Sequence, residues 1–289
     1  MFATAQNAMT NDQLMRVAPS IFAATAWEGV SDRYAFIPTI VVIEALREEG
    51  FVPVKANQSR TRIDGKREFT KHMIRFQHVD AQLDLAAAQR ANPGHFFYDH
   101  HGITAPEIPQ IVLVNSHDRS SGYQMCAGLY RLACSNGLMV ATQTLESVKV
   151  RHGGNAKDMV IEGFARIVDE MPLVLGHVDG MKSIKLDREE QTIFAAAAME
   201  LRYPTDDDGK KTAPIKPADL LTPRRVADRS TDLWTTFNTV QENFVKGGIR
   251  GVGTTGRRTH TRAVNTVNED IRLNKALWTL AEQMRALKA

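Results

Sequence analysis

The first part of the chain changes from a helical to an extended pattern of apolar positions at residue 50. Apolar residues at helical spacing predict a short helix that begins after Asn11 or Asp12, and a stronger helix in 37–49 that ends at Gly50. Two extended runs follow in 51–80, one on each side of Asp64-Gly65. That dipeptide supplies the positive φ values of a tight hairpin turn. In the second run apolar and polar residues alternate, which predicts a half-buried strand.

The middle of the chain mixes extended and helical patterns. Residues 81–109 contain Pro93, Gly94, Pro106 and Pro109, which break any long element, so we expect an irregular segment there. The run "QIVLVNSHD" predicts a buried strand. The next stretch, 119–137, has serines that would cap a helix and an Asn-Gly that would close it, so we expect a helix. Residues 138–152 again read as extended.

The second half of the chain is dominated by helical periodicity. Helices are expected after Asn155, after a capping-box-like Asp187 and Glu190, and in the segments "TDLWTTFNTVQENFV" and "NEDIRLNKALWTLAEQMRALK". The fold class is therefore α+β: a small antiparallel β-sheet with a basic hairpin packed on a central helix, followed by a mainly helical C-terminal half. The expected domains are an N-terminal helical arm (1–30), an α+β core (31–203), a linker (204–217) and a helical C-terminal region with a basic Gly/Arg loop (218–289).

Composition restricts the class of protein without naming a function. Apolar residues make up 43% and charged residues 24%, as in an ordinary globular chain, and the net charge of +3 does not by itself indicate nucleic acid. No apolar run is long enough for a membrane span and no secretory leader is visible, so we expect a cytoplasmic protein without a membrane partner. Cys126 and Cys134 lack metal-type spacing and are expected to be reduced thiols.

The segment "KGGIRGVGTTGRRTHTR" (246–262) contains a GxGxxG match at Gly251, Gly253 and Gly256. A dinucleotide site needs such glycines between a strand and the start of a helix, and here the preceding segment is helical. A phosphate-binding GxxxxGK[ST] pattern does not occur either. What remains is a glycine-rich segment with five cations and no acidic residue, which suits a sequence-independent contact to phosphates. The alternative is a solvated basic loop. The cations are Lys246, Arg250, Arg257, Arg258 and Arg262.

The expected hairpin carries a second group of cations with few acidic neighbours. If the two groups meet in space they form a groove that could follow a single strand. Nearby aromatic residues are expected to be core, with Tyr98 the one nominated for stacking. The hairpin cations are Lys55, Arg60, Arg62, Lys66, Arg67, Lys71 and Arg75.

Histidine and aspartate cluster in "HFFYDHHG" and "NSHD" and raise a different possibility. These residue types can bind a metal or perform acid–base chemistry. The spacing matches no metal motif, so hydrogen-bonded structural histidines are the main expectation. A metal-dependent hydrolase or nuclease remains the alternative, using His95, Asp99, His100, His117 and Asp118.

Two resemblances extend this interpretation. The blocks "NSHD…SNGL" and "GGIRGVGTTGRRTHTRAV" are similar to a family of uncharacterised proteins of phages, plasmids and prophage islands, a domain of unknown function, from about residue 30 to the C-terminus. The order of helix, basic hairpin, strand and helix also resembles the core of phage single-strand annealing proteins of the Red-beta and RecT type. That resemblance implies an oligomeric ring or filament that holds one strand with its bases exposed.

The expectation from sequence is a single-stranded DNA-binding protein of a phage or plasmid, acting in strand annealing or recombination. It needs no cofactor, no metal and no bond chemistry, so it is not expected to be an enzyme. Its expected partners are single-stranded nucleic acid and further copies of itself. The alternatives are the metal-dependent hydrolase or nuclease, and a protein that blocks a host defence component by contact alone.

Overall fold

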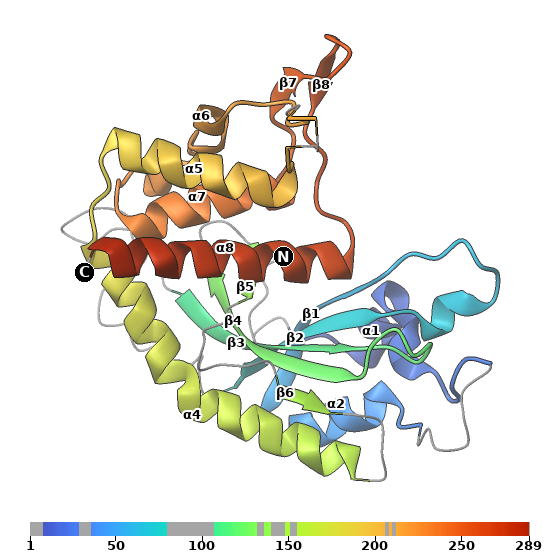
Figure 1. Cartoon of the computed structure of the whole chain (residues 1–289). Helices are drawn as coiled ribbons and strands as arrows, with labels where there is room; N and C mark the ends of the chain where they lie inside the picture. Colours follow the sequence, from blue (N-terminus) through green and yellow to red (C-terminus); the bar gives the residue numbers. More distant parts are fainter. Residues whose placement is uncertain are drawn as a thin grey trace. The chain divides into compact units, whose positions relative to one another are not determined.

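The computed structural model describes residues 8–28, 36–79, 107–131, 136–139, 148–150, 155–205, 208–209 and 212–288. The chain divides into two compact units, and the boundary between their described parts lies between Pro172 and Leu173. The first unit contains an antiparallel sheet and the second is mainly helical (Figure 1). The α+β class expected from the sequence is therefore confirmed. The expected boundaries at residues 30, 203 and 217 stay a prediction.

The sheet of the first unit has six strands, all paired antiparallel. Five of them follow one another in chain order across the sheet, and the sixth pairs with β4. The strands are β1 (Phe51–Gln58), β2 (His72–His78), β3 (Glu107–Asn115), β4 (Tyr123–Arg131), β5 (Asn136–Met139) and β6 (Val148–Val150).

The helix expected in 119–137 is wrong, because Tyr123–Arg131 is the central strand β4. It pairs with β3 along its whole length and with β5 and β6 on its other side. Almost every residue of β4 is buried, so its sequence lacks the alternation that marks a strand with one wet face. A short apolar run of this kind cannot be told from a buried helix by periodicity alone.

The hairpin is present, but its turn differs from the expectation. Strands β1 and β2 pair antiparallel, as the sequence predicted. The prediction of a tight turn at Asp64-Gly65 is wrong, because residues 59–71 separate the strands and include the short 3₁₀ helix η3 (Lys66–Phe69). Gly65 has a φ of 73° and begins that helix. The prediction that β2 is half-buried is also wrong, since six of its seven residues are buried.

Four helical segments besides η3 belong to the described part of the first unit, and α4 packs an aromatic residue on the sheet. The Phe164 ring meets the rings of Phe51 and Phe76 edge-on, each at a centroid distance of 5.3 Å. Thr10, rather than Asn11 or Asp12, caps the first helix. The segments are α1 (Asn11–Val17), η2 (Pro19–Phe22), α2 (Thr39–Glu48) and the part of α4 (Ala156–Ser183) up to Pro172.

The second unit is built around a helix that is buried on all sides. Residues 233–244 of α7 are buried, and Trp234, Phe237 and Trp278 pack together there. The capping box of Asp187 and Glu190 is present at the start of α5, as expected. The elements are α5 (Arg188–Arg202), α6 (Pro217–Leu220), η4 (Val226–Asp228), α7 (Leu233–Lys246), β7 (Arg250–Val252), β8 (Arg258–His260) and α8 (Val267–Lys288).

We predict that Phe164→Ala lowers the free energy of unfolding by about 3–5 kcal/mol, because it removes a fully buried ring and leaves a cavity between α4 and the sheet. Val168→Ala, one turn further along α4 and 44% exposed, is the control and should cost less than about 1 kcal/mol. Urea unfolding followed by circular dichroism measures both. An equal loss in the two variants would contradict the packing described here.

Candidate nucleic-acid interface

The glycine-rich segment forms a two-stranded antiparallel ribbon, which we define as residues 250–260. Arg250 pairs with His260, and Val252 pairs with Arg258. Gly253 N–H donates to the Arg257 carbonyl and closes the turn. The ribbon extends beyond the helices of its own unit (Figure 1). The segment is thus an ordered hairpin, rather than a loop whose use lies in its flexibility.

The glycines of the GxGxxG match serve this hairpin. A Cβ on Gly251 would lie 2.1 Å from the Pro214 carbonyl oxygen, so only glycine permits the hydrogen bond from Val252 N–H to that oxygen. Gly256 has a φ of 77° and belongs to the turn. The segment follows helix α7 and has no parallel strand beside it. The structure therefore confirms the helix before this segment, on which the argument against a dinucleotide site was based.

Two arginines from other segments hold the base of the ribbon. The Arg202 guanidinium donates to the carbonyl oxygens of Phe244 and Arg262 and lies over the rings of Tyr203 and Phe244. The Arg224 guanidinium donates to the Gly247 carbonyl at 2.5 Å. The bonds to Phe244 and Gly247 satisfy oxygens at the C-terminal end of α7 that have no partner inside the helix, and the bond to Arg262 reaches the chain that follows the ribbon.

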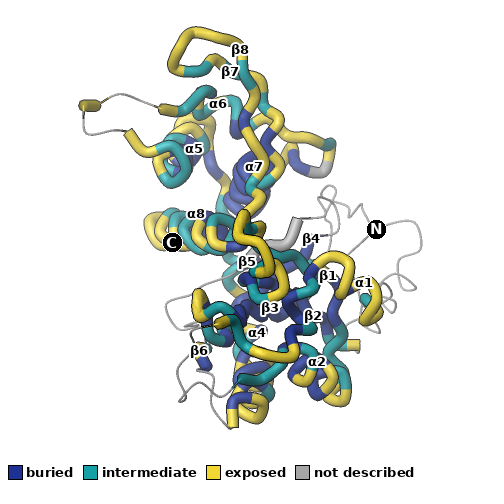
Figure 2. The backbone as a smooth tube through the Cα atoms, turned by 90° about the vertical axis from the view of Figure 1, so that its right-hand side faces the viewer, coloured by how far each residue is buried: buried dark blue, intermediate teal, exposed yellow. Residues whose placement is uncertain are grey.

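One face of the ribbon is left to solvent and carries cations. Residues paired across two strands share a face, so Arg250, Val252, Arg258 and His260 lie together, and all four are exposed (Figure 2). Gly251 and Thr259 form the other face, against the segment that contains Pro214. Among the residues that the structure describes, none forms an ion pair with Arg250, Arg257, Arg258 or Arg262.

Lys246, the remaining cation predicted in this segment, has a different position. Its ammonium group lies 2.7 Å from the carboxylate of Glu242, which is nearly fully buried. Arg225 contacts the same carboxylate and also Asp228, at 3.0 Å. Lys246 therefore compensates a buried charge.

The hairpin cations cluster around the basic loop, which we define as residues 59–71. Arg60, Arg62 and Arg67 are exposed there, and Lys55 is exposed on β1. Arg75 is 2% exposed within the sheet, so it does not share a solvent-facing surface with the others. The even spacing of Arg67, Lys71 and Arg75 gives no common face, because Arg67 lies in η3 and Lys71 precedes β2.

Asp118 neutralises part of the basic loop. Its carboxylate lies 3.1 Å from the Lys66 ammonium. Burial raises the pKa of Asp118, but hydrogen bonds from Ser120 and Lys66 outweigh that effect and hold the pKa below its usual value. Burial lowers the pKa of Lys71 more than the Asp118 charge raises it. Arg60, Arg62 and Arg67 are the cations most open to a ligand here.

His117 belongs to a buried polar network. Its Nε2 lies 3.0 Å from the Thr39 hydroxyl, which also meets His72 Nε2 at 2.9 Å and accepts from Asn115 Nδ2 at 3.0 Å. Ser20 donates its hydroxyl proton to Gln58 and so accepts from His72 Nδ1. Thr39 then donates to His72, which leaves His117 Nε2 as a donor to Thr39.

This assignment describes a structural histidine, the main expectation for His117. The His117 side chain is fully buried, and Asp118 makes separate contacts with Lys66 and Ser120. His95, Asp99, His100 and Tyr98 lie outside the described residues. Within the described part of the chain no three His, Cys, Asp or Glu side chains are grouped to hold a metal. The metal-dependent alternative stays a prediction.

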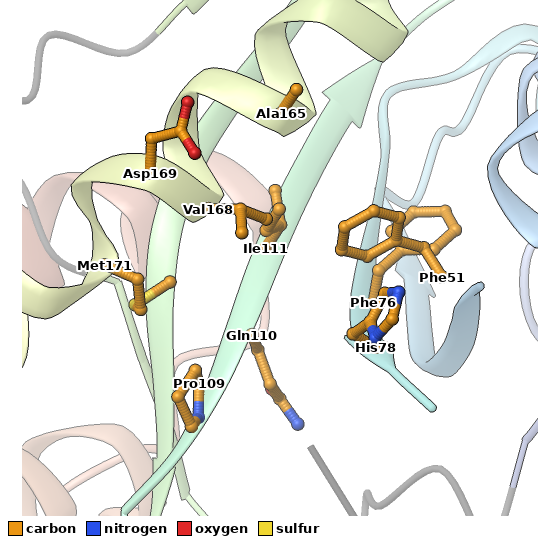
Figure 3. A pocket seen from close by; sticks show the side chains of 10 residues that line it. All are labelled: Phe51, Phe76, His78, Pro109, Gln110, Ile111, Ala165, Val168, Asp169 and Met171. Atoms are coloured by element: carbon orange, nitrogen blue, oxygen red, sulfur yellow. The ribbon is translucent and has the colours of Figure 1, made fainter. Parts of the chain in front are cut away.

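An apolar pocket of about 480 Å³ lies between the sheet and α4 in the first unit (Figure 3). Phe51, Phe76 and Ile111 line it from the sheet, and Val168 lines it from α4. Its polar residues are His78, Gln110 and Asp169. His78 Nε2 is engaged with the Glu49 carbonyl at 3.2 Å, and the lining offers no nucleophile paired with a base. The pocket therefore provides no argument for an enzyme.

Sequence reasoning missed three residues that shape these surfaces. Arg202 and Arg224 position the ribbon, and their contacts go to carbonyl groups, which leave no trace in a sequence. Trp27 packs on Phe69 beside the basic loop. The available signal for Trp27 was a large aromatic residue in a segment without clear periodicity.

A sheet-based unit and a helical unit, each with an exposed basic hairpin segment, define the chain as an α+β protein with two candidate polyanion-binding surfaces. The chain belongs to the family defined by the domain of unknown function DUF932, whose model matches residues 26–278. It is 39% identical over 276 residues to the UPF0380 protein YafZ of Escherichia coli strain K12, covering 96% of this chain and 91% of that one. It is 38% identical, with the same coverage, to the UPF0380 protein YfjQ of the same organism. No solved structure matches.

No helix in the described part of the chain has both the length and the apolar character needed to cross a membrane.

We predict that Gly251→Ala destabilises the ribbon, because the new methyl group would overlap the Pro214 carbonyl. Gly253→Ala is the matched control from the same motif, since its Cβ would meet atoms no closer than 3.7 Å. Limited proteolysis measures the effect, with faster cleavage in 250–260 expected for Gly251→Ala alone. Equal cleavage of the two variants would contradict the role assigned to Gly251.

We predict that Thr39→Val lowers the free energy of unfolding by about 1–3 kcal/mol, because it removes a hydroxyl that serves His72, His117 and Asn115 and leaves buried polar groups without that partner. Thr279→Val, at an exposed position of α8, is the control and should change stability little. Chemical unfolding measures both. A neutral Thr39→Val would show that the network does not contribute to stability.

Proposed function

We propose that this protein binds the sugar–phosphate backbone of nucleic acid, with single-stranded DNA as the expected form. The observation that supports this most is the exposed ribbon face with its uncompensated arginines. The basic loop, with Arg60, Arg62 and Arg67, would be a second contact site.

The arginines of the ribbon differ from the cations that hold the fold together, because no carboxylate of the described chain is paired with them. Five of the eleven arginines of the second unit contact a carboxylate or a carbonyl group within the described chain, among them Arg225 and Arg202. Arg257 and Arg258 answer none in the described chain, although the ribbon holds them next to each other. A phosphate chain would supply the missing anions, and the release of its condensed counterions would favour binding without reading sequence.

The ribbon suits a backbone contact better than base-specific recognition. Its exposed face carries no aromatic side chain on which a base could stack, apart from the imidazole of His260. Arginine forms paired hydrogen bonds with phosphate oxygens through its planar guanidinium group. We therefore assign electrostatic attachment to the ribbon.

The proposed biological role is strand annealing or protection of replication intermediates for a phage or plasmid. Annealing breaks and forms no covalent bond: it needs neutralised phosphates and accessible bases. The order of helix, basic hairpin and strand still resembles Red-beta and RecT proteins, although strand β4 stands where the resemblance expected a helix. The resemblance implies a homo-oligomer.

We predict that the double variant Arg257→Glu/Arg258→Glu weakens binding to a short single-stranded oligonucleotide at low salt by on the order of tenfold or more. Fluorescence anisotropy at several salt concentrations measures it. The slope of log K against log salt should also become shallower, by about 0.7 for each lost phosphate contact. The double variant Arg188→Glu/Arg229→Glu, at two exposed arginines outside the ribbon, changes the net charge by the same amount and is the control; it should bind almost like wild type.

Wild-type affinity in the Arg257/Arg258 double variant, with an unchanged salt slope, would remove the ribbon from the proposal. Weak binding by the wild-type protein with a flat salt response would remove the proposed function itself.

A further inference from the structure

We propose that Trp27 and Phe69 form a stacking platform for an unpaired base, with Arg62 and Arg67 placed to contact the adjoining phosphates. This inference rests on the proposed function and names its substrate as a single strand.

The two rings form a partly open aromatic surface. Their centroids are 5.2 Å apart at an interplanar angle of 58°, and both residues are partly exposed. The chain has three tryptophans, and the other two, Trp234 and Trp278, are 3% and 0% exposed in the second unit. Trp27 thus differs from the others in presenting indole surface to solvent.

The platform is held in place by the backbone of His117. Trp27 N–H donates to the His117 carbonyl at 2.9 Å, and His117 N–H donates to the Phe69 carbonyl at 3.0 Å. The His117 side chain is itself fixed by Thr39 in the buried network. A stacking surface positioned in this way loses little conformational entropy when a base arrives.

Gly65 lies beside the Trp27 ring and has no side chain that could cover it. A Cβ built on Gly65 would lie 3.9 Å from the Trp27 ring, so the backbone at residue 65 passes close to the indole. Gly65 has a positive φ of 73°, a backbone conformation that favours glycine, at the point where the basic loop passes the Trp27 ring. Ile63, two residues earlier in the same loop, is a further apolar residue open to solvent, at 57% exposed.

Exposed cations lie in the same loop as Phe69. Arg60, Arg62 and Arg67 belong to the same loop, whereas Asp118 is already bound to Lys66. A surface that combines stacking rings with nearby cations suits single strands, because their bases are free to stack and their phosphates follow alongside. In a duplex the bases are paired and stacked on one another. The ribbon, in contrast, offers cations without such rings.

Two measurements on the full chain test the platform, using an oligo(dT) strand and a duplex of matched length. The first is tryptophan fluorescence during titration: we expect quenching by the single strand in wild type and its loss in Trp27→Phe, because Trp234 and Trp278 are buried. The second is affinity by anisotropy. Trp27→Leu should bind the single strand about tenfold more weakly, the size of one lost base–aromatic stack, while Trp27→Phe retains most of the affinity.

Further readouts separate stacking from a structural role. Trp27→Leu should leave the salt slope and the duplex affinity unchanged, whereas Arg62→Glu/Arg67→Glu should make the slope shallower. Met159→Ala, at a 41% exposed apolar position of α4, is the control and should match wild type. If Trp27→Leu fails to fold by circular dichroism, Phe69→Leu and the wild-type quenching decide.

Each outcome has a distinct meaning. Single-strand binding without tryptophan quenching, or with wild-type affinity in Trp27→Leu, overturns the platform and leaves the proposed function standing. An equal loss of single-strand and duplex affinity in Trp27→Leu also overturns it. Absence of any binding by wild type overturns both proposals.

Discussion

The carbonyl oxygens at the end of helix α7 have no partner inside the helix, and the way they are satisfied determines which arginines of the second unit face solvent. Arg202 and Arg224 donate to these oxygens and to the chain that returns from the ribbon. These two guanidinium groups are therefore engaged with carbonyl groups of the second unit. The same bonds fix the path of the chain after Lys246. The close approach of Gly251 to Pro214 then decides which face of the ribbon is covered. Arg250 and Arg258 face solvent as a consequence.

A comparable constraint acts in the first unit. The Thr39 hydroxyl holds two buried imidazoles, and one of them, His117, has backbone bonds to both Trp27 and Phe69. The interior polar network is therefore continuous with the surface that carries the basic loop. In both units, hydrogen bonds within the fold position side chains that reach the solvent.

The sequence predicted elements well where local signals are strong. The capping box at Asp187 and the helical periodicity of α7 and α8 were recognised, because caps and amphipathic spacing act within one segment. Strand β4 was taken for a helix, since its burial on both faces removes the alternation that marks a strand. The sequence also did not show which cations are exposed and which form ion pairs within the fold. Lys246 and Arg258 look alike in sequence, yet of these two only Lys246 contacts the Glu242 carboxylate.

The central claim is that Arg257 and Arg258, with the arginines of the basic loop, contact a phosphate chain. Arginine-selective modification with phenylglyoxal, read by mass spectrometry with and without saturating single-stranded DNA, tests this most directly. The account predicts that Arg257, Arg258, Arg62 and Arg67 become protected, while Arg188 reacts at the same rate in both samples. Unchanged modification of Arg257 and Arg258 in the presence of bound DNA would contradict it.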